Sequence, residues 1–355
     1  MAIDISGFTE ILYDIKNGGT KEVTWQLHHL ITLRLAQAYK RIDSPKYQRI
    51  VNCAGYMEFR RYEDNSMKLH TANFCQTRLC PTCNWRRSYK MFAQVSKIMD
   101  SISDDYGFVF LTLTCKNVSG EHLNRQLNIM FSAYKALCLR KRFKAAVHGW
   151  CRTLEVTYNW KSKEFHPHFH CILAVDKTYF TSALYITQEE FCLMWQDCLN
   201  VDYKPIVDIR TFTESEKGKG KEVAEVAKYT IKASNIMANL QGISQYSQDI
   251  QTEVKRITDR ITDEIVFILD SALANRRLIG YGGIFKQKHK ELNLDDEIDG
   301  DLIHTKDDSI QSGLNYQIER YRWHIGYRNY VRLEDDRAAQ ESGETDCEHS
   351  GDYEH

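Results

Sequence analysis

Helical and strand-like spacings of apolar side chains alternate along the first part of the chain. Residues 21–41 place apolar side chains at every third or fourth position, which predicts an amphipathic helix. A β-hairpin is predicted for "YMEFRRYEDNSMKL" (residues 56–69) and a helix for "RRSYKMFAQVSKIMDSI" (residues 86–102). The β-branched and aromatic run "GFVFLTLTCKN" (residues 107–117) then predicts a buried strand.

The second part of the chain continues this alternation. Two strand-like runs, "WCRTLEVTYNW" and "FHPHFHCILAV", flank the polar break "KSKE" and predict a hairpin over residues 150–175. Helical spacing predicts four further helices, at residues 121–144, 188–198, 220–240 and 245–275. The glycines of "RRLIGYGGIFK" (residues 276–286) mark a turn. The order of elements predicts an α+β fold, with an antiparallel sheet and helices packed against one of its faces.

Charge is distributed unevenly along the 355 residues. Residues 291–355 carry 18 acidic and 6 basic side chains, a net charge of −12, which leaves +11 on the preceding 290 residues. A basic body suits a protein that meets a polyanion, and the acidic segment would limit indiscriminate contact. A solvated acidic segment without such a role fits equally well, and from Glu334 onward the composition predicts disorder.

Cysteine content and hydropathy indicate the compartment. Eleven cysteines, no signal-peptide pattern and no apolar run near ~20 residues favour a protein of the reducing cytoplasm, with no membrane segment. Reduced thiols in such a chain are available as metal ligands.

Three histidines alternate inside the second hairpin strand. His166, His168 and His170 lie on one face because side chains alternate along a strand. Pairing Trp160 with Phe165 would place Glu155 opposite His170 and Thr157 opposite His168. His168, His170 and Glu155 could then bind one Mg²⁺ or Mn²⁺ ion.

Several alternatives to this ligand set remain open. His166 would support the site or replace one ligand. A slip of one residue in the register would turn Glu155 away from the site. A third alternative is a structural zinc held by the three histidines, although a three-histidine site on one strand would be strained. The fourth is a solvated histidine face without metal.

The segment "FCQTRLCPTCNWRR" contains a metal-binding turn. Four thiolates in this region suit tetrahedral Zn²⁺, with the C-P-x-C sequence forming the turn. The predicted ligands are Cys53, Cys75, Cys80 and Cys83, with His70 as an alternative to Cys53 and free buried thiols as the metal-free alternative. Arg86 and Arg87 follow this turn and could contact phosphate, as could "RKRFK" at 140–144; solvated helix ends explain these charges equally well.

Three motifs together resemble a known family. "HPHFH" is similar to the metal-binding motif of the HUH endonucleases, which nick single-stranded DNA with a tyrosine. Within that group the chain most resembles the replication initiator (Rep) proteins of rolling-circle plasmids, of the single-tyrosine type. "FLTLT" resembles their first motif, "LEVTYN" with "HPHFH" their second and "EVAEVAKYTIK" (residues 222–232) their third, and "CQTRLCPTC" resembles their cysteine segment.

The resemblance implies roles for residues of the third motif. Tyr229 would attack the scissile phosphate, leaving a 5′-phosphotyrosine and a free 3′-OH. Glu225, four residues earlier on the same predicted helical face, would activate the water that ends replication, with Glu222 as an alternative base. Lys228 and Lys232 would supply positive charge near the DNA.

The resemblance also implies a function and a domain organisation. The protein would nick a plasmid origin, as single-stranded or hairpin DNA, and work with the host helicase and DNA polymerase. A conjugative relaxase, an HUH transposase and a non-catalytic zinc DNA-binding protein are the rival functions. The expected regions are an N-terminal helical region (1–50), a zinc-binding segment (51–100), an HUH endonuclease core (101–240), a C-terminal helical region (241–333) and the acidic tail (334–355).

Overall fold

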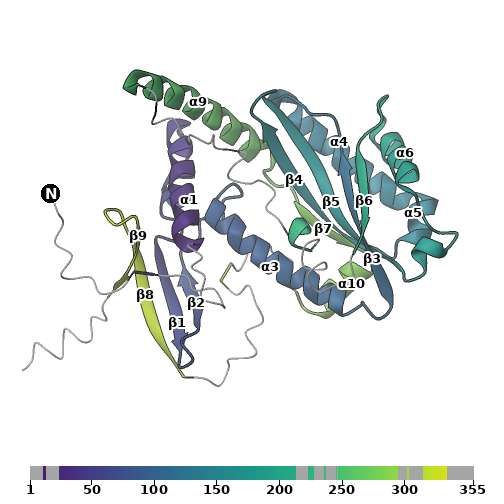
Figure 1. Ribbon diagram of the computed structural model, residues 1–355, viewed down its shortest axis with the longest axis horizontal. Helices are drawn as coiled ribbons and strands as arrows, with labels where there is room; N and C mark the ends of the chain where they lie inside the picture. The colour runs from purple at the N-terminus through teal and green to yellow at the C-terminus, as the bar shows by residue number, and fades with distance from the viewer. Residues whose placement is uncertain are drawn as a thin grey trace, which may run out of the picture.

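The computed structural model describes residues 11–12, 24–212, 223–227, 236, 245, 247–294, 302–303 and 315–333. Two antiparallel sheets with flanking helices make up this part of the chain (Figure 1), which confirms the α+β class. Most of the helix expected at 220–240 and all of the tail expected at 334–355 lie outside the described residues. Within the described part, no helix is both long and apolar enough to cross a bilayer.

The larger sheet has five strands in the order β6-β3-β5-β4-β7. The expected hairpin forms its centre, with β5 lying between β3 and β4. The strand bounds are β3 Tyr106–Thr114, β4 Gly149–Asn159, β5 Glu164–Asp176, β6 Val207–Thr211 and β7 Ile279–Gly282.

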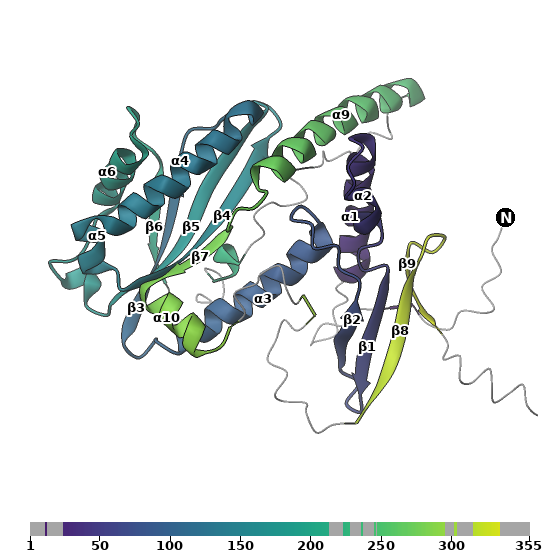
Figure 2. The ribbon, with the colours of Figure 1, turned by 180° about the vertical axis from the view of Figure 1, so that it is seen from behind.

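Helices cover both faces of this sheet, whereas the sequence analysis expected only one covered face. Phe169, Cys171 and Leu173 of β5 pack on one side, and Ile172 and Ala174 pack on the other. Because β5 is apolar on both faces from Cys171 to Val175, both faces need a helical cover. Figures 1 and 2 show α4 (Gly120–Leu139), α5 (Lys141–Ala146) and α6 (Gln188–Leu199) on one side of the sheet, and α3 (Pro81–Asp100) and α10 (Gly283–Glu291) on the other.

The predicted glycine turn lies between β7 and α10. Gly283 has a φ of +55°, and a Cβ atom there would lie 2.0 Å from the carbonyl oxygen of His148. Only glycine fits this close approach of two backbones.

The smaller sheet joins distant parts of the chain in the order β2-β1-β8-β9. Strands β1 (Tyr56–Tyr62) and β2 (Met67–Ala72) form the expected N-terminal hairpin, while β8 (Tyr316–His324) and β9 (Asn329–Leu333) come from the C-terminal region. The C-terminal region is therefore not only helical, as expected, because it supplies β7, β8 and β9. The charged Glu319 at a buried position concealed β8 in the sequence.

Helix α1 (Thr24–Arg41) lies between the two sheets and meets α9 (Gln248–Ala272), as Figure 1 shows. Arg41 forms an ion pair with Asp263 at 2.7 Å, and the Tyr39 hydroxyl donates to Asp270 at 2.9 Å. Two short helices, α2 (Tyr47–Val51) and the 3₁₀ turn η1 (Tyr179–Thr181), complete the described elements with named bounds. These contacts hold α1 against α9.

Candidate active site and zinc centre

The histidine strand β5 and its partner β4 have a register two residues away from the expected one. Glu155 pairs with His168 rather than His170, because Asn159 pairs with Glu164. Asn159 closes the turn: its carbonyl accepts from the amide of Lys163 at 2.8 Å, and its side chain accepts from the amide of Lys161 at 2.9 Å. A shift of two residues preserves the face of each side chain, so Glu155 still faces the histidines.

Glu155, His168 and His170 form a compact, buried cluster of possible metal ligands. The Oε2 atom of Glu155 lies 3.4 Å from His168 Nε2 and 3.1 Å from His170 Nε2. Neighbouring ligands of an octahedral ion at a bond length of about 2.1 Å are about 3.0 Å apart, so these atoms fit around one Mg²⁺ or Mn²⁺ ion with little movement. The predicted ligand set is therefore assembled on the sheet face that α3 covers.

Hydrogen bonds at the far side of each ring orient the two histidines. His168 Nδ1 lies 3.2 Å from the carbonyl oxygen of His166, which can only accept, so Nδ1 donates and Nε2 of the neutral ring keeps its lone pair for a metal. His170 Nδ1 lies 3.2 Å from Thr112 Oγ1 on β3. The sequence analysis missed Thr112 as a site residue. The sequence feature that could have indicated Thr112 is its place at alternate spacing within "FLTLT". That segment forms the strand that pairs with the histidine strand.

His166 stands outside the ligand cluster. Its Nδ1 atom lies 2.8 Å from Asn117 Oδ1, and its ring lies beside that of His168. Burial, followed by the neighbouring His168, lowers the pKa of His166 below its ordinary value. The structure thus favours a supporting position for His166 over its use as an alternative ligand.

Glu225 reaches the same site from a separate segment. Val223, Val226 and Ala227 are buried in the apolar cluster that α3 forms with the sheet, and this anchors the short helical segment 223–226. Glu225 Oε1 lies 3.9 Å from His170 Nε2. The other residues predicted from the third motif, Glu222, Lys228, Tyr229 and Lys232, lie outside the described residues.

Four cysteines form a second cluster beneath α1. Cys53, Cys75, Cys80 and Cys83 are all buried, and their sulfur atoms lie within 4.8 Å of one another. The Sγ–Sγ distances are 3.5 Å between Cys53 and Cys83, and 3.6 Å for both the Cys75–Cys83 and the Cys53–Cys80 pair. Tetrahedral zinc with Zn–S bonds of about 2.3 Å separates its sulfurs by about 3.8 Å, whereas a disulfide holds them at about 2.05 Å. The cluster therefore fits zinc, and it includes Cys53 and not His70.

The pKa shifts of Cys75 and Cys53 agree with a cation-binding role. Hydrogen bonds from Cys53, Cys80 and Cys83 lower the pKa of Cys75 far below its ordinary value. The same contacts, together with burial, raise the pKa of Cys53. Without a cation, protons must separate these crowded sulfurs, because four thiolates would repel one another. A divalent ion replaces those protons when it binds.

The basic residues expected to contact phosphate hold the protein itself together. Arg87 is buried and donates to the carbonyls of Gln76 and Thr77, so it fixes the loop between the zinc-site cysteines. Arg86 donates to the carbonyls of Leu302 and Ile303, and its guanidinium also lies over two tryptophan rings, those of Trp25 and Trp85. These contacts give Arg86 and Arg87 a role within the fold, and a contact of either residue with DNA stays a prediction.

Two arginines of the basic run "RKRFK" at 140–144 also make contacts within the fold. Arg140 forms an ion pair with Asp197, and Arg142 donates to the carbonyls of Ala183 and Tyr185. Both arginines therefore tie α5 to the α6 region.

Comparison with known proteins assigns the chain to a family. Residues 66–331 match the family model described as "Replication protein". The chain belongs to this Rep family. The matched region contains the histidine strand, Glu225 and three of the four clustered cysteines, and Cys53 precedes it. The resemblance seen in the sequence motifs is thereby confirmed, and the protein is a plasmid replication initiator.

Relatives cover most of the Rep chain. It is 40% identical to "Protein rep" of Bacillus amyloliquefaciens over 82% of this chain and 87% of the relative. It is 35% identical to "Protein rep" of Streptococcus pneumoniae over 90% of this chain and 95% of the relative. A third "Protein rep", from Lentilactobacillus hilgardii, is 33% identical over 90% of this chain and 98% of the relative. No solved structure matches this Rep chain.

Proposed function

We propose that this Rep protein starts rolling-circle replication by nicking one strand of a plasmid double-strand origin through tyrosine transesterification. The observation that carries the proposal is the convergence of Glu155, His168 and His170 with Glu225 at one sheet face. One carboxylate and two neutral imidazoles suit Mg²⁺ or Mn²⁺, which would stabilise negative charge on a scissile phosphate.

Tyr229 is the proposed nucleophile. Tyr229 follows Glu225 by four residues in the sequence, and Glu225 lies beside the ligand cluster, which supports this assignment. Its phenolate oxygen would form a bond to phosphorus as the bond from phosphorus to the 3′-oxygen breaks. That oxygen takes up a proton and becomes the free 3′-OH from which a polymerase extends, while the 5′-phosphate stays on the tyrosine. Lys228 and Lys232 would favour the phenolate form by their charge.

Glu225 is the proposed base for the terminating step. Its carboxylate would take a proton from a water molecule that attacks phosphorus in the second DNA cleavage, and the bond from that phosphorus to the 3′-oxygen would break. A carboxylate near the ligand cluster, rather than a second tyrosine, supports a terminating reaction that releases the product instead of passing it to another protein residue.

Zinc at the four cysteines would have a structural role. The cysteines are buried and form a complete tetrahedral set, and a closed set of four protein ligands is typical of structural rather than catalytic zinc. Origin DNA, the host helicase and the host polymerase are the partners that this function requires.

The rival functions predict different products. A conjugative relaxase or a transposase would use the same nicking chemistry, but the long matches to proteins named Rep favour the replication initiator. A non-catalytic zinc DNA-binding protein would form no covalent adduct and would not need Tyr229.

The test is adduct formation with single-stranded DNA. The protein is incubated with Mn²⁺ and labelled oligonucleotides that tile the replicon encoding it, and the products are separated on denaturing gels. We expect a covalent 5′-phosphate adduct that mass spectrometry assigns to Tyr229. The adduct should be lost with EDTA, in Tyr229→Phe and in Glu155→Gln. DNA binding without any adduct across the whole tiling set would overturn the proposal in favour of the zinc DNA-binding protein.

A further inference from the structure

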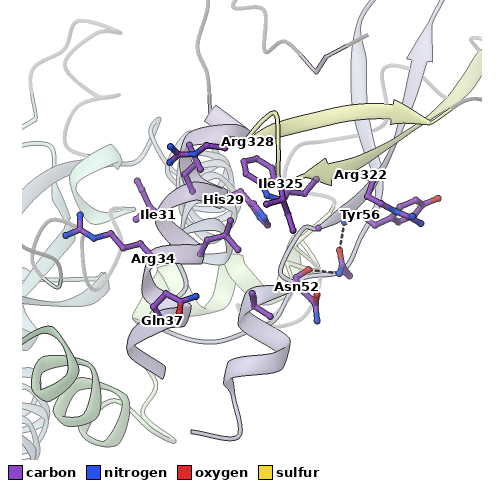
Figure 3. A pocket seen from close by; sticks show the side chains of 15 residues that line it. His29, Ile31, Arg34, Gln37, Asn52, Tyr56, Arg322, Ile325 and Arg328 are labelled. Carbon is purple, nitrogen blue, oxygen red and sulfur yellow. Dashed lines mark hydrogen bonds between the residues drawn. The ribbon is translucent and has the colours of Figure 1, made fainter. Parts of the chain in front are cut away.

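A large groove lies outside the candidate active site. It has a volume of about 1050 Å³ and lies between α1, the α2–β1 connection and the turn that joins β8 to β9. Figure 3 shows side chains from these segments facing a common hollow, with His29 of α1 next to Ile325 of the turn. Residues far apart in the sequence thus build one surface. Glu155, His168 and His170 do not line it.

The charge around this groove has one sign. Arg34, Arg322 and Arg328 line it, and none of the described lining residues is a carboxylate. All three arginines are exposed, and Arg322 and Arg328 make no ion pair with any residue that the structure describes. In Figure 3 they stand around the hollow, with Arg34 on α1, Arg322 on β8 and Arg328 in the turn just before β9. This arrangement complements a polyanion.

The groove walls indicate which polyanion fits. They are mainly apolar and include Ile31 and Trp323, and at the tip of the turn Ile325 is 85% exposed. Duplex DNA accepts a convex element in its own grooves, whereas a concave apolar surface with an aromatic side chain accepts unpaired bases. The floor also holds a buried polar atom: His29 is 1% exposed, its Nδ1 lies 2.9 Å from the carbonyl oxygen of Cys53, and its Nε2 has no described partner.

We propose that this groove binds single-stranded DNA, with phosphates on Arg34, Arg322 and Arg328 and bases against the apolar walls. This inference rests on the proposed function, because a nickase that acts on a plasmid origin must hold the strand it exposes. It assigns to the region of the smaller sheet a DNA contact separate from the catalytic cluster.

The cysteine cluster supports one wall of the groove. Val51, Asn52 and Gly55, which flank Cys53, line it, and so does Asn73, two residues before Cys75. The Asn73 side chain ties the wall together: it donates to the carbonyl of Asn52 at 2.6 Å and accepts from the amide of Tyr56 at 3.0 Å. Zinc at the cysteines would therefore shape a DNA-binding surface as well as stabilise the fold.

The test measures binding without cleavage. The variant Tyr229→Phe serves as background, with no divalent ion added and with a fluorescent 20-nucleotide single strand as probe. In this background, two double variants are compared. The groove variant carries Arg322→Gln and Arg328→Gln, and the control variant carries Lys204→Gln and Arg256→Gln. The control pair loses the same two charges from exposed positions that do not line the groove. Circular dichroism checks that both variants fold.

We expect the groove variant to bind about tenfold more weakly and to reduce the slope of log affinity against log salt by about 1.4, because each single-strand phosphate contact contributes about 0.7. The control pair should keep the slope of the parent. Equal slopes for the two variants would overturn the inference. It would also be overturned if a peptide of residues 334–355 bound the parent but not the groove variant while DNA bound both, since the occupant would then be the acidic segment.

The same variants separate this inference from the proposed function. In the Tyr229 background, binding is measured independently of adduct formation. If the wild type forms the adduct but the groove variant binds DNA normally, DNA binding by the groove is refuted and the nickase proposal stands. If no adduct ever forms but the salt slope still depends on the two arginines, the nickase proposal is refuted and DNA binding by the groove stands.

Discussion

Glu225 Oε1 lies 3.9 Å from His170 Nε2, although the two residues belong to different segments of the chain. The distance is too long for a direct hydrogen bond and places the Glu225 carboxylate beside the ligand cluster. The Glu225 side chain is 32% exposed, so water reaches it, while the Glu155 side chain in the cluster is only 5% exposed. This difference in exposure supports the proposed roles of Glu155 as a metal ligand and Glu225 as a base.

The first prediction concerns Glu225→Gln. The amide keeps the size of the side chain but cannot take a proton from water. We expect the tyrosine adduct to form at nearly the wild-type rate and the water-dependent second cleavage to slow by about 10²- to 10⁴-fold. The measurement is a single-turnover reaction of the adduct with a second labelled origin strand, in which both cleavages are followed on denaturing gels.

Glu222→Gln is the matched control for this base. It changes the other glutamate of the same motif and should leave both rates unchanged. If Glu225→Gln slowed both steps equally, Glu225 would act in metal binding rather than as the base of the second step.

The second prediction concerns the orientation of His170. Thr112→Val keeps the shape of the side chain and removes the oxygen that lies 3.2 Å from His170 Nδ1. Loss of such a supporting contact typically weakens a metal site by about 10- to 100-fold, so we expect Mn²⁺ affinity to fall at least about tenfold. Calorimetric titration of the metal measures this without DNA.

Thr114→Val provides the comparison. This threonine lies two residues further along β3, and its hydroxyl donates to the carbonyl of Ile206 at 2.8 Å. It should leave Mn²⁺ affinity unchanged. Similar affinities in the two valine variants would show that Thr112 does not position His170.

The third prediction is one zinc ion per chain. Cys83→Ser removes one of four converging thiolates, and we expect the affinity for zinc to fall by at least ~1000-fold, about 4 kcal/mol. Elemental analysis of the purified protein gives the stoichiometry, and thermal unfolding reports the accompanying loss of stability. Cys138→Ser, at a cysteine outside the cluster, should keep its zinc. If Cys83→Ser still contained one zinc ion per chain, the four cysteines would not be the zinc site.

The local elements and the two ligand clusters could be predicted from the sequence because they depend on short-range patterns. Period-two spacing alone put His168 and His170 on one face, and the C-P-x-C sequence indicated the turn at Cys80. The register between β4 and β5 could not be read, because it depends on how the side chain of Asn159 closes the turn. Because the register differs by an even number of residues, Glu155 stays on the face of the histidines and the predicted ligand set is unchanged.

Long-range pairing was beyond sequence reasoning. Strand β8 pairs with β1 from more than 250 residues away, and neither strand indicates its partner. Arg86 and Arg87 looked like surface charges because their acceptors are backbone carbonyls, which leave no trace in a sequence. Thr112 was missed because a threonine in a strand is ordinary, and only its position opposite His170 gives it a role.

The last prediction links the stability of the smaller sheet to pH through Glu319. This side chain is buried on β8, accepts from Arg61 Nε at 2.6 Å and from the Tyr321 hydroxyl at 3.0 Å, and lies 3.4 Å from Arg332. Burial alone would raise the pKa of Glu319, but these partners outweigh it and hold the pKa below the ordinary value of 4.5. A lowered pKa in the folded state stabilises the fold above the unfolded-state pKa, and this contribution is lost as the pH falls through the folded-state pKa.

We therefore expect Glu319→Gln to lower the free energy of unfolding by about 2 kcal/mol at pH 7, because charge-assisted hydrogen bonds become neutral ones. The difference from wild type should shrink once the pH falls below 4.5, where protonated Glu319 resembles the amide. Urea unfolding at both pH values measures this. The four clustered cysteines are the same in both proteins, so acid affects them equally. Glu121→Gln, at a side chain that is 76% exposed, should match wild type at both pH values. A Glu319→Gln deficit that stays constant with pH would mean that packing, rather than charge, makes Glu319 important to the sheet.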